Sequence, residues 1–268
     1  MEVNKIYCES CLDTMSKMDD GIVDIILTSP PYNTNKAAGR HRTLETDNHK
    51  WYPNVRYDSY VDTIPNEEYI SKSVNLFNNF DRILVKDGCV LYNMSYGSNN
   101  PHIMYDTIYN IIHSTPFSLA DTIVWKKKSA LPVWTKNKLT RQCEFIFVFC
   151  RDKEFKTFNT AKKIKTIRPT NLVQYEAHFT NFIEAANSDK REGSTKINCA
   201  RFSTDLVTKL LNIYAHKDGL LIYDPFMGSG TTAVGALMSG HTFIGSEISQ
   251  KQVDWANTWI SEYKEDGE

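Results

Sequence analysis

The strongest constraint on the fold is the stretch from Leu220 to Glu247, where a strand, a glycine turn, a helix and a second strand follow one another. Leu220–Tyr223 is an apolar run typical of a buried strand, Thr231–Ser239 has a helical pattern, and Thr242–Gly245 is again strand-like. A tight hairpin cannot join parallel strands, whereas a helical crossover can. The stretch therefore predicts two neighbouring strands of a parallel sheet.

The turn inside this unit reads Asp-Pro-Phe-Met-Gly-Ser-Gly-Thr-Thr and predicts a ligand-binding loop. Gly228 and Gly230 allow the backbone to approach a ligand closely at the N-terminus of the helix. A P-loop would require a lysine after the second glycine, and Thr231 stands there instead. Glu247, just beyond the second strand, is where such folds bind ribose hydroxyls. An NAD enzyme is an alternative on this geometry, although Ala233 replaces its third glycine.

Strand-like runs alternate with helical patterns along the rest of the chain. Such alternation predicts a mostly parallel sheet with helices on both faces. Two stretches do not follow the pattern: Thr34–Tyr60, which is polar with several aromatic residues, and Lys126–Lys196, which is mostly irregular and basic. The predicted strands are 24–27, 88–93, 121–125 and 145–149, and the predicted helices are 66–84, 102–113, 202–214 and 250–263.

The charge of the chain is distributed unevenly. Its net charge is -1, yet Trp125–Pro169 holds 13 Lys and Arg residues against 3 Asp and Glu residues. An acidic body with a basic middle is typical of a protein that binds a polyanion through an insert, although a solvated basic face would give the same composition. No apolar run approaches the roughly 20 residues that a membrane helix needs. The first ten residues lack the pattern of a signal peptide, which predicts a cytoplasmic protein, acting at the nucleoid or, if viral, inside a host cell.

The cysteines give no indication of a metal site. There are six of them, and Cys8 and Cys11 form a single Cys-x-x-Cys pair. A zinc site would require a second pair of Cys or His at matching spacing. We therefore interpret the cysteines as reduced thiols in or near the core, without a metal.

A second unusual turn follows the predicted strand at 24–27. It reads Thr-Ser-Pro-Pro-Tyr-Asn, residues 28–33. Proline fixes its own φ and cannot donate to a sheet ladder, so two consecutive prolines make a rigid exit from a core strand. Taken alone, the turn could simply terminate that strand.

The two turns together resemble the AdoMet-dependent DNA methyltransferases that modify exocyclic amino groups. The catalytic motif of that family is Asp/Asn/Ser-Pro-Pro-Tyr/Phe, and its cofactor motif is centred on Phe-x-Gly-x-Gly; the order here resembles the permuted beta class. Residues 6–15 look like the segment that closes over the cofactor adenine, and residues 198–203 look like the segment before the cofactor strand, with its His and both prolines replaced. The resemblance implies a Rossmann-like methyltransferase fold over 1–125 and 197–268, with a target-recognition region over 126–196.

The resemblance also implies a catalytic role for Ser29, Pro30, Pro31 and Tyr32. An aromatic amine is a poor nucleophile because its lone pair is delocalised into the ring. Acceptors at Ser29 Oγ and the Pro30 carbonyl would bind its two N–H groups, localise the lone pair and be preorganised by the rigid turn. Tyr32 would stack on the base, which must leave the duplex to reach the pocket, and such stacking is worth roughly 1–3 kcal/mol.

The cofactor implied is S-adenosyl-L-methionine. Its expected contacts come from the segment at 6–15 before the catalytic strand, from the first residue of the helix at 202–214, and from the glycine turn with the strand-end acid. These residues are Glu9, Ser10, Cys11, Phe202, Asp224, Phe226, Gly228, Gly230, Thr231, Thr232 and Glu247.

The target is expected to be double-stranded DNA. Relatives that act on cytosine N4 more often carry Ser at the first motif position, so Ser29 favours N4-cytosine, with N6-adenine as the alternative. Thr34–Tyr60 is hypothesised to form a flap at the flipped base. A homodimer and a cognate restriction endonuclease are further partners that the resemblance suggests. Candidate DNA contacts are Arg40, Arg42, Lys126, Lys127, Lys128, Lys136, Lys138 and Arg141, with Lys162, Lys163, Lys165 and Arg168 beyond them.

Other functions compete with this one. An RNA amino-methyltransferase would use the same chemistry, and an inactive DNA-binding module would keep the basic region without catalysis. The motif order favours DNA, and the intact residues of both motifs argue against an inactive module.

Overall fold

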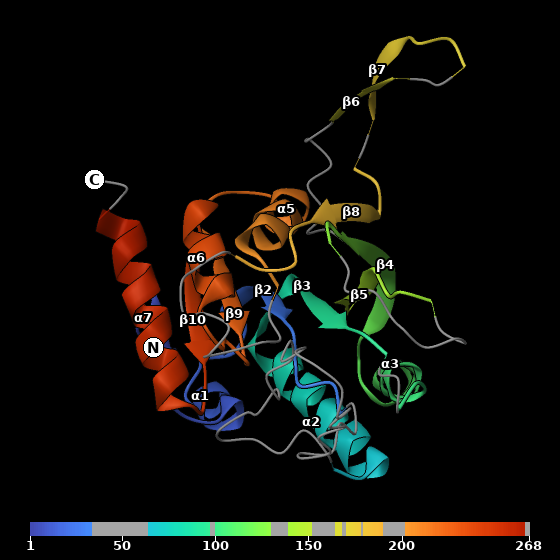
Figure 1. Ribbon diagram of the computed structural model, residues 1–268. Helices are drawn as coiled ribbons and strands as arrows, with labels where there is room; N and C mark the ends of the chain where they lie inside the picture. Colours follow the sequence, from blue (N-terminus) through green and yellow to red (C-terminus); the bar gives the residue numbers. More distant parts are fainter. Residues whose placement is uncertain are drawn as a thin grey trace, which may run out of the picture.

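The computed structural model describes residues 1–33, 64–96, 100–129, 139–151, 164–167, 170–177, 179–189 and 202–265 (Figure 1). The strands are β1 (Lys5–Tyr7), β2 (Val23–Thr28), β3 (Leu84–Met94), β4 (Ser118–Lys127), β5 (Cys143–Cys150), β6 (Ile164–Ile167), β7 (Gln174–Ala177), β8 (Phe182–Ala185), β9 (Leu221–Asp224) and β10 (Thr242–Ser246). The helices are α1 (Cys11–Ser16), α2 (Asn66–Ile83), α3 (Ile103–Ser114), α5 (Thr204–Tyr214), α6 (Thr231–Met238) and α7 (Gln250–Glu265).

Eight strands form one sheet in the order β1-β10-β9-β2-β3-β5-β4-β8. Every neighbouring pair is parallel except the two that involve β5. The carboxyl ends of the other seven strands therefore lie along one edge, and the reversed strand β5 brings its first residues to that same edge. Glu144, near the start of β5, pairs with Trp125, near the end of β4.

Helices cover both faces of the sheet. Residues of α5, α6 and α7 form one hydrophobic core with the sheet, and residues of α1, α2 and α3 form the other (Figure 1). Phe77 of α2 is fully buried and lies at the centre of an aromatic group. Its ring centroid is 4.9–5.5 Å from those of Phe80, Tyr92, Phe117 and Phe149. The α/β fold with a mostly parallel sheet is thus confirmed.

The region 126–196 differs from the expected single insert. Strands β5 and β8 lie within it, yet both belong to the eight-stranded sheet. Among the described residues of this region, only β6 and β7 form a separate antiparallel pair, which projects away from the sheet in Figure 1. Of the three strands beyond β3, two therefore come from the stretch that was expected to form the target-recognition region, and β4 comes mainly from the expected methyltransferase domain.

The cysteines are free where the structure describes them, as predicted, but Cys8 is exposed rather than near the core. Across the described ranges there is no group of three or more His, Cys, Asp or Glu side chains placed to hold a metal ion. Over those same ranges no helix is long and apolar enough to cross a membrane.

Candidate active site

The two motifs meet at the centre of the sheet, where β2 lies beside β9. From β2 the chain continues through α2 to β3 on one side, and from β9 it continues through α6 to β10 on the other. In open α/β sheets, ligands bind outside the carboxyl ends of strands at such a switch point. The turn after β2 carries Ser29 and Tyr32, and the turn after β9 carries the glycines.

Asp224, the last residue of β9, joins these turns. Its carboxylate accepts hydrogen bonds from Thr28 Oγ1 at 2.7 Å, Thr232 Oγ1 at 2.5 Å and the Phe226 backbone N–H at 2.9 Å. Burial raises the pKa of Asp224 to about 6, while the hydrogen bonds from Thr232, Thr28 and Phe226 oppose that shift. Asp224 and Thr232 thus hold the cofactor turn against the catalytic turn.

The glycine turn has the backbone conformation that its sequence predicts. Gly228 has φ 55° and Gly230 has φ 90°, both in the left-handed region that favours glycine. A Cβ on Gly230 would also lie 2.8 Å from Cβ of Ala256, so this glycine is needed for the packing of α7 as well. The backbone N–H of Gly228 donates to Glu247 Oε2 at 2.9 Å.

Glu247 lies at the start of the loop that follows β10, beside the end of β1. Its carboxylate also accepts the backbone N–H of Ser249 at 2.9 Å, and its own N–H donates to the Tyr7 carbonyl at 3.1 Å. The parallel pairing of Tyr7 with Ser246 brings residues 8–10 to the same edge as Glu247. This is the arrangement expected of a strand-end acid and an adenine-side segment.

In that segment, two of the expected contacts have local structural roles. Ser10 caps α1, accepting the backbone N–H of Asp13 at 3.2 Å. Glu9 accepts from Thr14 Oγ1 at 3.0 Å and pairs with Lys17. Burial raises the pKa of the Cys11 thiol to about 11, so this cysteine is protonated at neutral pH.

The cofactor turn leaves two buried hydroxyls available to a ligand. Ser229 Oγ and Thr231 Oγ1 have no hydrogen-bond partner among the residues that the structure describes, although both side chains are almost completely buried. Buried polar groups without partners are rare in folded proteins. Together with Glu247, they provide hydroxyl and carboxylate groups suited to the polar parts of AdoMet, so the residues fit this cofactor.

The catalytic turn is held on both sides. Tyr69 of α2 donates its hydroxyl to the Pro31 carbonyl at 2.6 Å. Asn33, which has φ 48°, accepts the Ile64 backbone N–H and donates back to the Ile64 carbonyl, each at 3.0 Å. No hydrogen bond to the Pro30 carbonyl is found within the described part of the chain, which leaves it as an acceptor.

Two polar residues that sequence reasoning missed surround the Tyr32 hydroxyl. Asn93 of β3 donates its Nδ2 to Tyr32 Oη at 2.7 Å, and Tyr32 Oη lies 3.2 Å from Glu144 Oε2 of β5. Glu144 in turn forms an ion pair with Lys127. The antiparallel direction of β5 places Glu144 here, and the sequence carries no signal for that direction.

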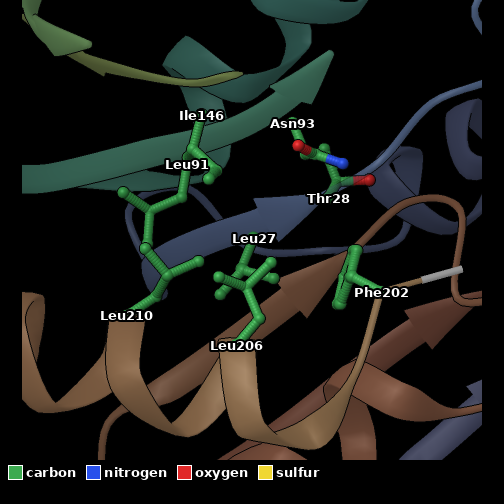
Figure 2. Close-up of a pocket in the computed structure, with 8 residues that line it drawn as sticks. All are labelled: Leu27, Thr28, Leu91, Asn93, Ile146, Phe202, Leu206 and Leu210. Carbon is green, nitrogen blue, oxygen red and sulfur yellow. The ribbon is translucent and has the colours of Figure 1, made fainter. Parts of the chain in front are cut away.

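A small cavity of about 10 Å³ lies beside the catalytic turn, between the sheet and α5 (Figure 2). Its polar end is formed by Thr28 and Asn93, and its apolar part by residues of β2, β3, β5 and α5. Phe202, expected beside the adenine, is 6% exposed and lines this cavity. The remaining lining residues are Leu27, Leu91, Ile146, Leu206 and Leu210.

Three of the lysines expected to contact DNA form ion pairs with acidic side chains of the same chain. Lys126 pairs with Glu184 at 2.5 Å, Lys128 pairs with Asp205 at 3.3 Å, and Lys127 pairs with Glu144. Arg141 donates to the Tyr96 carbonyl and lies over the Tyr96 ring, 5.1 Å from its centroid. Several predicted sites lie outside the described residues: Arg40, Arg42, Lys136, Lys138, Lys162, Lys163 and Arg168, the hypothesised flap at 34–60, and residues 198–201.

Comparison with known proteins decides the family. A family model described as DNA methylase, for the N6 and N4 amino-methyltransferases, matches residues 23–258. The chain belongs to this family. It is therefore an AdoMet-dependent amino-methyltransferase, as the two motifs predicted, and an NAD enzyme is excluded.

Curated and solved relatives agree with this assignment. The methylase is 23% identical over 275 residues to the Type II methyltransferase M.BglII of Bacillus subtilis, covering 97% of this chain and 69% of the relative. It matches a structure of an M1.HpyAVI–SAM complex with TM-score 0.63 and 20% identity, covering 96% of this chain and 98% of the other. It matches the cytosine-N4-specific PvuII DNA methyltransferase with TM-score 0.67 and 16% identity, over 96% and 90% of the two chains. At these identities the structural matches establish the shared fold.

Proposed function

We propose that the methylase is a site-specific DNA methyltransferase that modifies the exocyclic amino group of a flipped base, N4 of cytosine. The observation that carries this proposal is the hydrogen bond between Thr28 and Asp224, which fixes the Ser-Pro-Pro-Tyr turn beside the cofactor turn. Bound AdoMet would supply a methyl group on a positively charged sulfonium. The nucleophile and the methyl group would then meet at one edge of the sheet, and positioning would supply much of the catalysis.

Ser29 and Pro30 are proposed to accept the two N–H groups of the target amine. The Pro30 carbonyl is available because Tyr69 binds the neighbouring Pro31 carbonyl instead. These acceptors need no reorientation during the reaction, since the turn is rigid and held from α2. Tyr32 would stack on the base while its hydroxyl stays fixed by Asn93.

The choice of cytosine rests on Ser29. A neutral hydroxyl stands where an aspartate is more usual in enzymes that act on adenine, and a solved relative that shares the fold is described as cytosine-N4-specific. N6 of adenine is the competing acceptor, because the same two hydrogen-bond acceptors would suit either amine.

Recognition of duplex DNA is proposed for the basic region within 126–196, apart from the strands that belong to the sheet. Basic side chains there would mostly contact phosphates, which position a protein on DNA without specifying a sequence. The relative M.BglII is named a Type II methyltransferase. We therefore include a cognate restriction endonuclease among the proposed partners of this chain. A homodimer is also proposed, and the mass of the protein in solution tests it.

The test is incubation with AdoMet and mixed-sequence duplex DNA, followed by digestion to nucleosides and mass spectrometry. N4-methylcytosine is the expected product. N6-methyladenine would overturn the choice of base and keep the chemistry. Transfer to structured RNA, with none to duplex DNA, would overturn the proposed substrate.

A further inference from the structure

The Tyr32 hydroxyl is the centre of a polar cluster that the expected roles of Ser29 and Tyr32 do not explain. Ser29 Oγ lies 2.9 Å from Tyr32 Oη, and Glu144 Oε2 lies 3.2 Å from Tyr32 Oη on another side. Asn93 Nδ2 is 2.7 Å from Tyr32 Oη, 3.1 Å from Glu144 Oε2 and 3.3 Å from Ser29 Oγ. The stacking of Tyr32 on a base would require only its ring.

The chemistry of these groups fixes the direction of each hydrogen bond. An ionised carboxylate only accepts and an amide NH₂ only donates, so Tyr32 must donate its single proton to Glu144 and accept from Asn93. Ser29 must then donate its own proton to Tyr32. The opposite orientation of the Asn93 amide would place its oxygen against the Glu144 carboxylate, which is repulsive. Ser29 Oγ has two lone pairs and accepts one long hydrogen bond, from Asn93 Nδ2 at 3.3 Å, so one lone pair is available to the N–H of the target amine.

Glu144 is held from three sides in this cluster, by Tyr32, Asn93 and Lys127. Its side chain is only 15% exposed, and its second oxygen pairs with the ammonium of Lys127. Lys127 itself lies over the Trp125 ring, 4.9 Å from its centroid, which fixes the position of the cation. A carboxyl group paired with a lysine thus ends a chain of two hydroxyls that begins at Ser29.

We propose that Glu144 is the terminal proton acceptor of a relay that runs from the target amine through Ser29 and Tyr32, and that Asn93 positions the relay. This inference rests on the proposed function. A neutral serine alone could not retain the proton that the amine loses. A carboxylate two hydrogen bonds away gives that proton a stable destination.

The amine nitrogen forms a bond to the methyl carbon, the carbon–sulfur bond breaks, and its electron pair stays on sulfur. The methylated nitrogen, now positively charged, gives a proton to Ser29 Oγ while Ser29 passes its own proton to Tyr32 and Tyr32 passes its own to Glu144. The base ends neutral, and Glu144 becomes a carboxylic acid that later releases the proton to water.

The test compares single-turnover methyl transfer to duplex DNA by the wild type, Glu144→Gln, Tyr32→Phe and the double variant. Each single change keeps the size of the side chain and removes the relay, so each rate is expected to fall about 100-fold. The double variant is expected to be no slower than the slower single variant, because both changes break one chain. Glu184→Gln, at the more exposed Lys126–Glu184 pair, is the matched control and should keep its rate.

Two further readouts separate proton transfer from a merely structural role. Added formate should restore part of the activity of Glu144→Ala. The transfer from light to heavy water should slow the wild type by a larger factor than it slows Tyr32→Phe. The relay is overturned if the effects of the two changes multiply, if formate restores nothing in a folded variant, or if Glu144→Gln is as fast as Glu184→Gln. Failure of the wild type to methylate DNA would instead overturn the proposed function.

Discussion

The hydroxyl of Thr28 donates a 2.7 Å hydrogen bond to the buried carboxylate of Asp224, and it thereby links two motifs that are 196 residues apart in the sequence. The same carboxylate binds Thr232 at the start of α6 and the backbone of Phe226. One buried acid therefore fixes the end of β2, the end of β9 and the first turn of α6 relative to one another. In the proposed function, the positions of the acceptor amine and of the cofactor depend on this arrangement.

Replacement of Thr28 by valine should destabilise the protein. The change keeps the shape of the side chain but leaves Asp224 without one of its donors, and a buried group deprived of a partner costs about 1–3 kcal/mol. Urea unfolding measures the loss. Thr258→Val, on the exposed face of α7, removes a similar hydroxyl and should change stability by less than about 0.5 kcal/mol. Equal effects of the two changes would contradict the role assigned to Thr28.

Asp224 should make the stability of the protein depend on pH. Its pKa is raised to about 6 in the folded state from 3.8, so between these values the folded protein binds more protons than the unfolded chain. The contribution of Asp224 is fully present below pH 3.8 and is lost as pH rises through about 6. The contribution of Asp224 is the difference between the free energies of unfolding of the wild type and of Asp224→Asn, measured at several pH values. The wild type should lose stability relative to the variant from pH 4 towards pH 7, and a difference that grew in the opposite direction would refute the assignment.

Tyr69→Phe should impair catalysis more than binding. The lost hydroxyl fixes the Pro31 carbonyl at 2.6 Å and so helps to hold the catalytic turn. A less rigid turn should slow single-turnover methyl transfer by about tenfold or more, since small misplacements at a reacting centre are costly. AdoMet affinity should stay within twofold, as titration calorimetry would show. Tyr105→Phe, on the exposed face of α3, is the control, and an equal slowing there would count against this explanation.

Glu247→Gln should weaken AdoMet binding. In the structure, the carboxylate organises the loop by accepting the backbone N–H groups of Gly228 and Ser249, and it is the proposed partner of the ribose hydroxyls. Hydrogen bonds to a charged group are worth about 1.5–3 kcal/mol, so the dissociation constant should rise about 10- to 150-fold. Glu265→Gln, at the end of α7, should leave it unchanged. An unaltered dissociation constant in Glu247→Gln would exclude the ribose role.

Much of the parallel sheet, and of the turns at its carboxyl edge, could be predicted from the sequence because the signals for them are local. The strands at 23–28, 221–224 and 242–246 are short apolar runs, and each is followed by a turn with unusual residues. Parallel strands end at one edge, so the catalytic turn, the glycine turn and Glu247 could be expected together. The N-terminal segment also reached this edge, because β1 pairs in parallel with β10.

The remainder depends on contacts that the sequence does not encode locally. The run at 143–150 could be predicted as a strand, but not its antiparallel direction, and this direction alone brings Glu144 to Tyr32. Lys126, Lys127 and Lys128 read as a basic stretch, whereas each is paired with an acid from a distant segment. The charge count was correct, but it could not reveal which charges the fold neutralises.

The most direct test of the central claim is the single-turnover rate of Ser29→Ala with saturating duplex DNA, with AdoMet affinity measured on the same preparation. The serine hydroxyl is the proposed acceptor for the target amine, and its hydrogen-bond partners in the described structure are Tyr32 and Asn93 rather than the glycine turn. The account predicts that methyl transfer falls at least about 100-fold, while the dissociation constant for AdoMet stays within twofold. A folded Ser29→Ala variant that methylates DNA at the wild-type rate would contradict it.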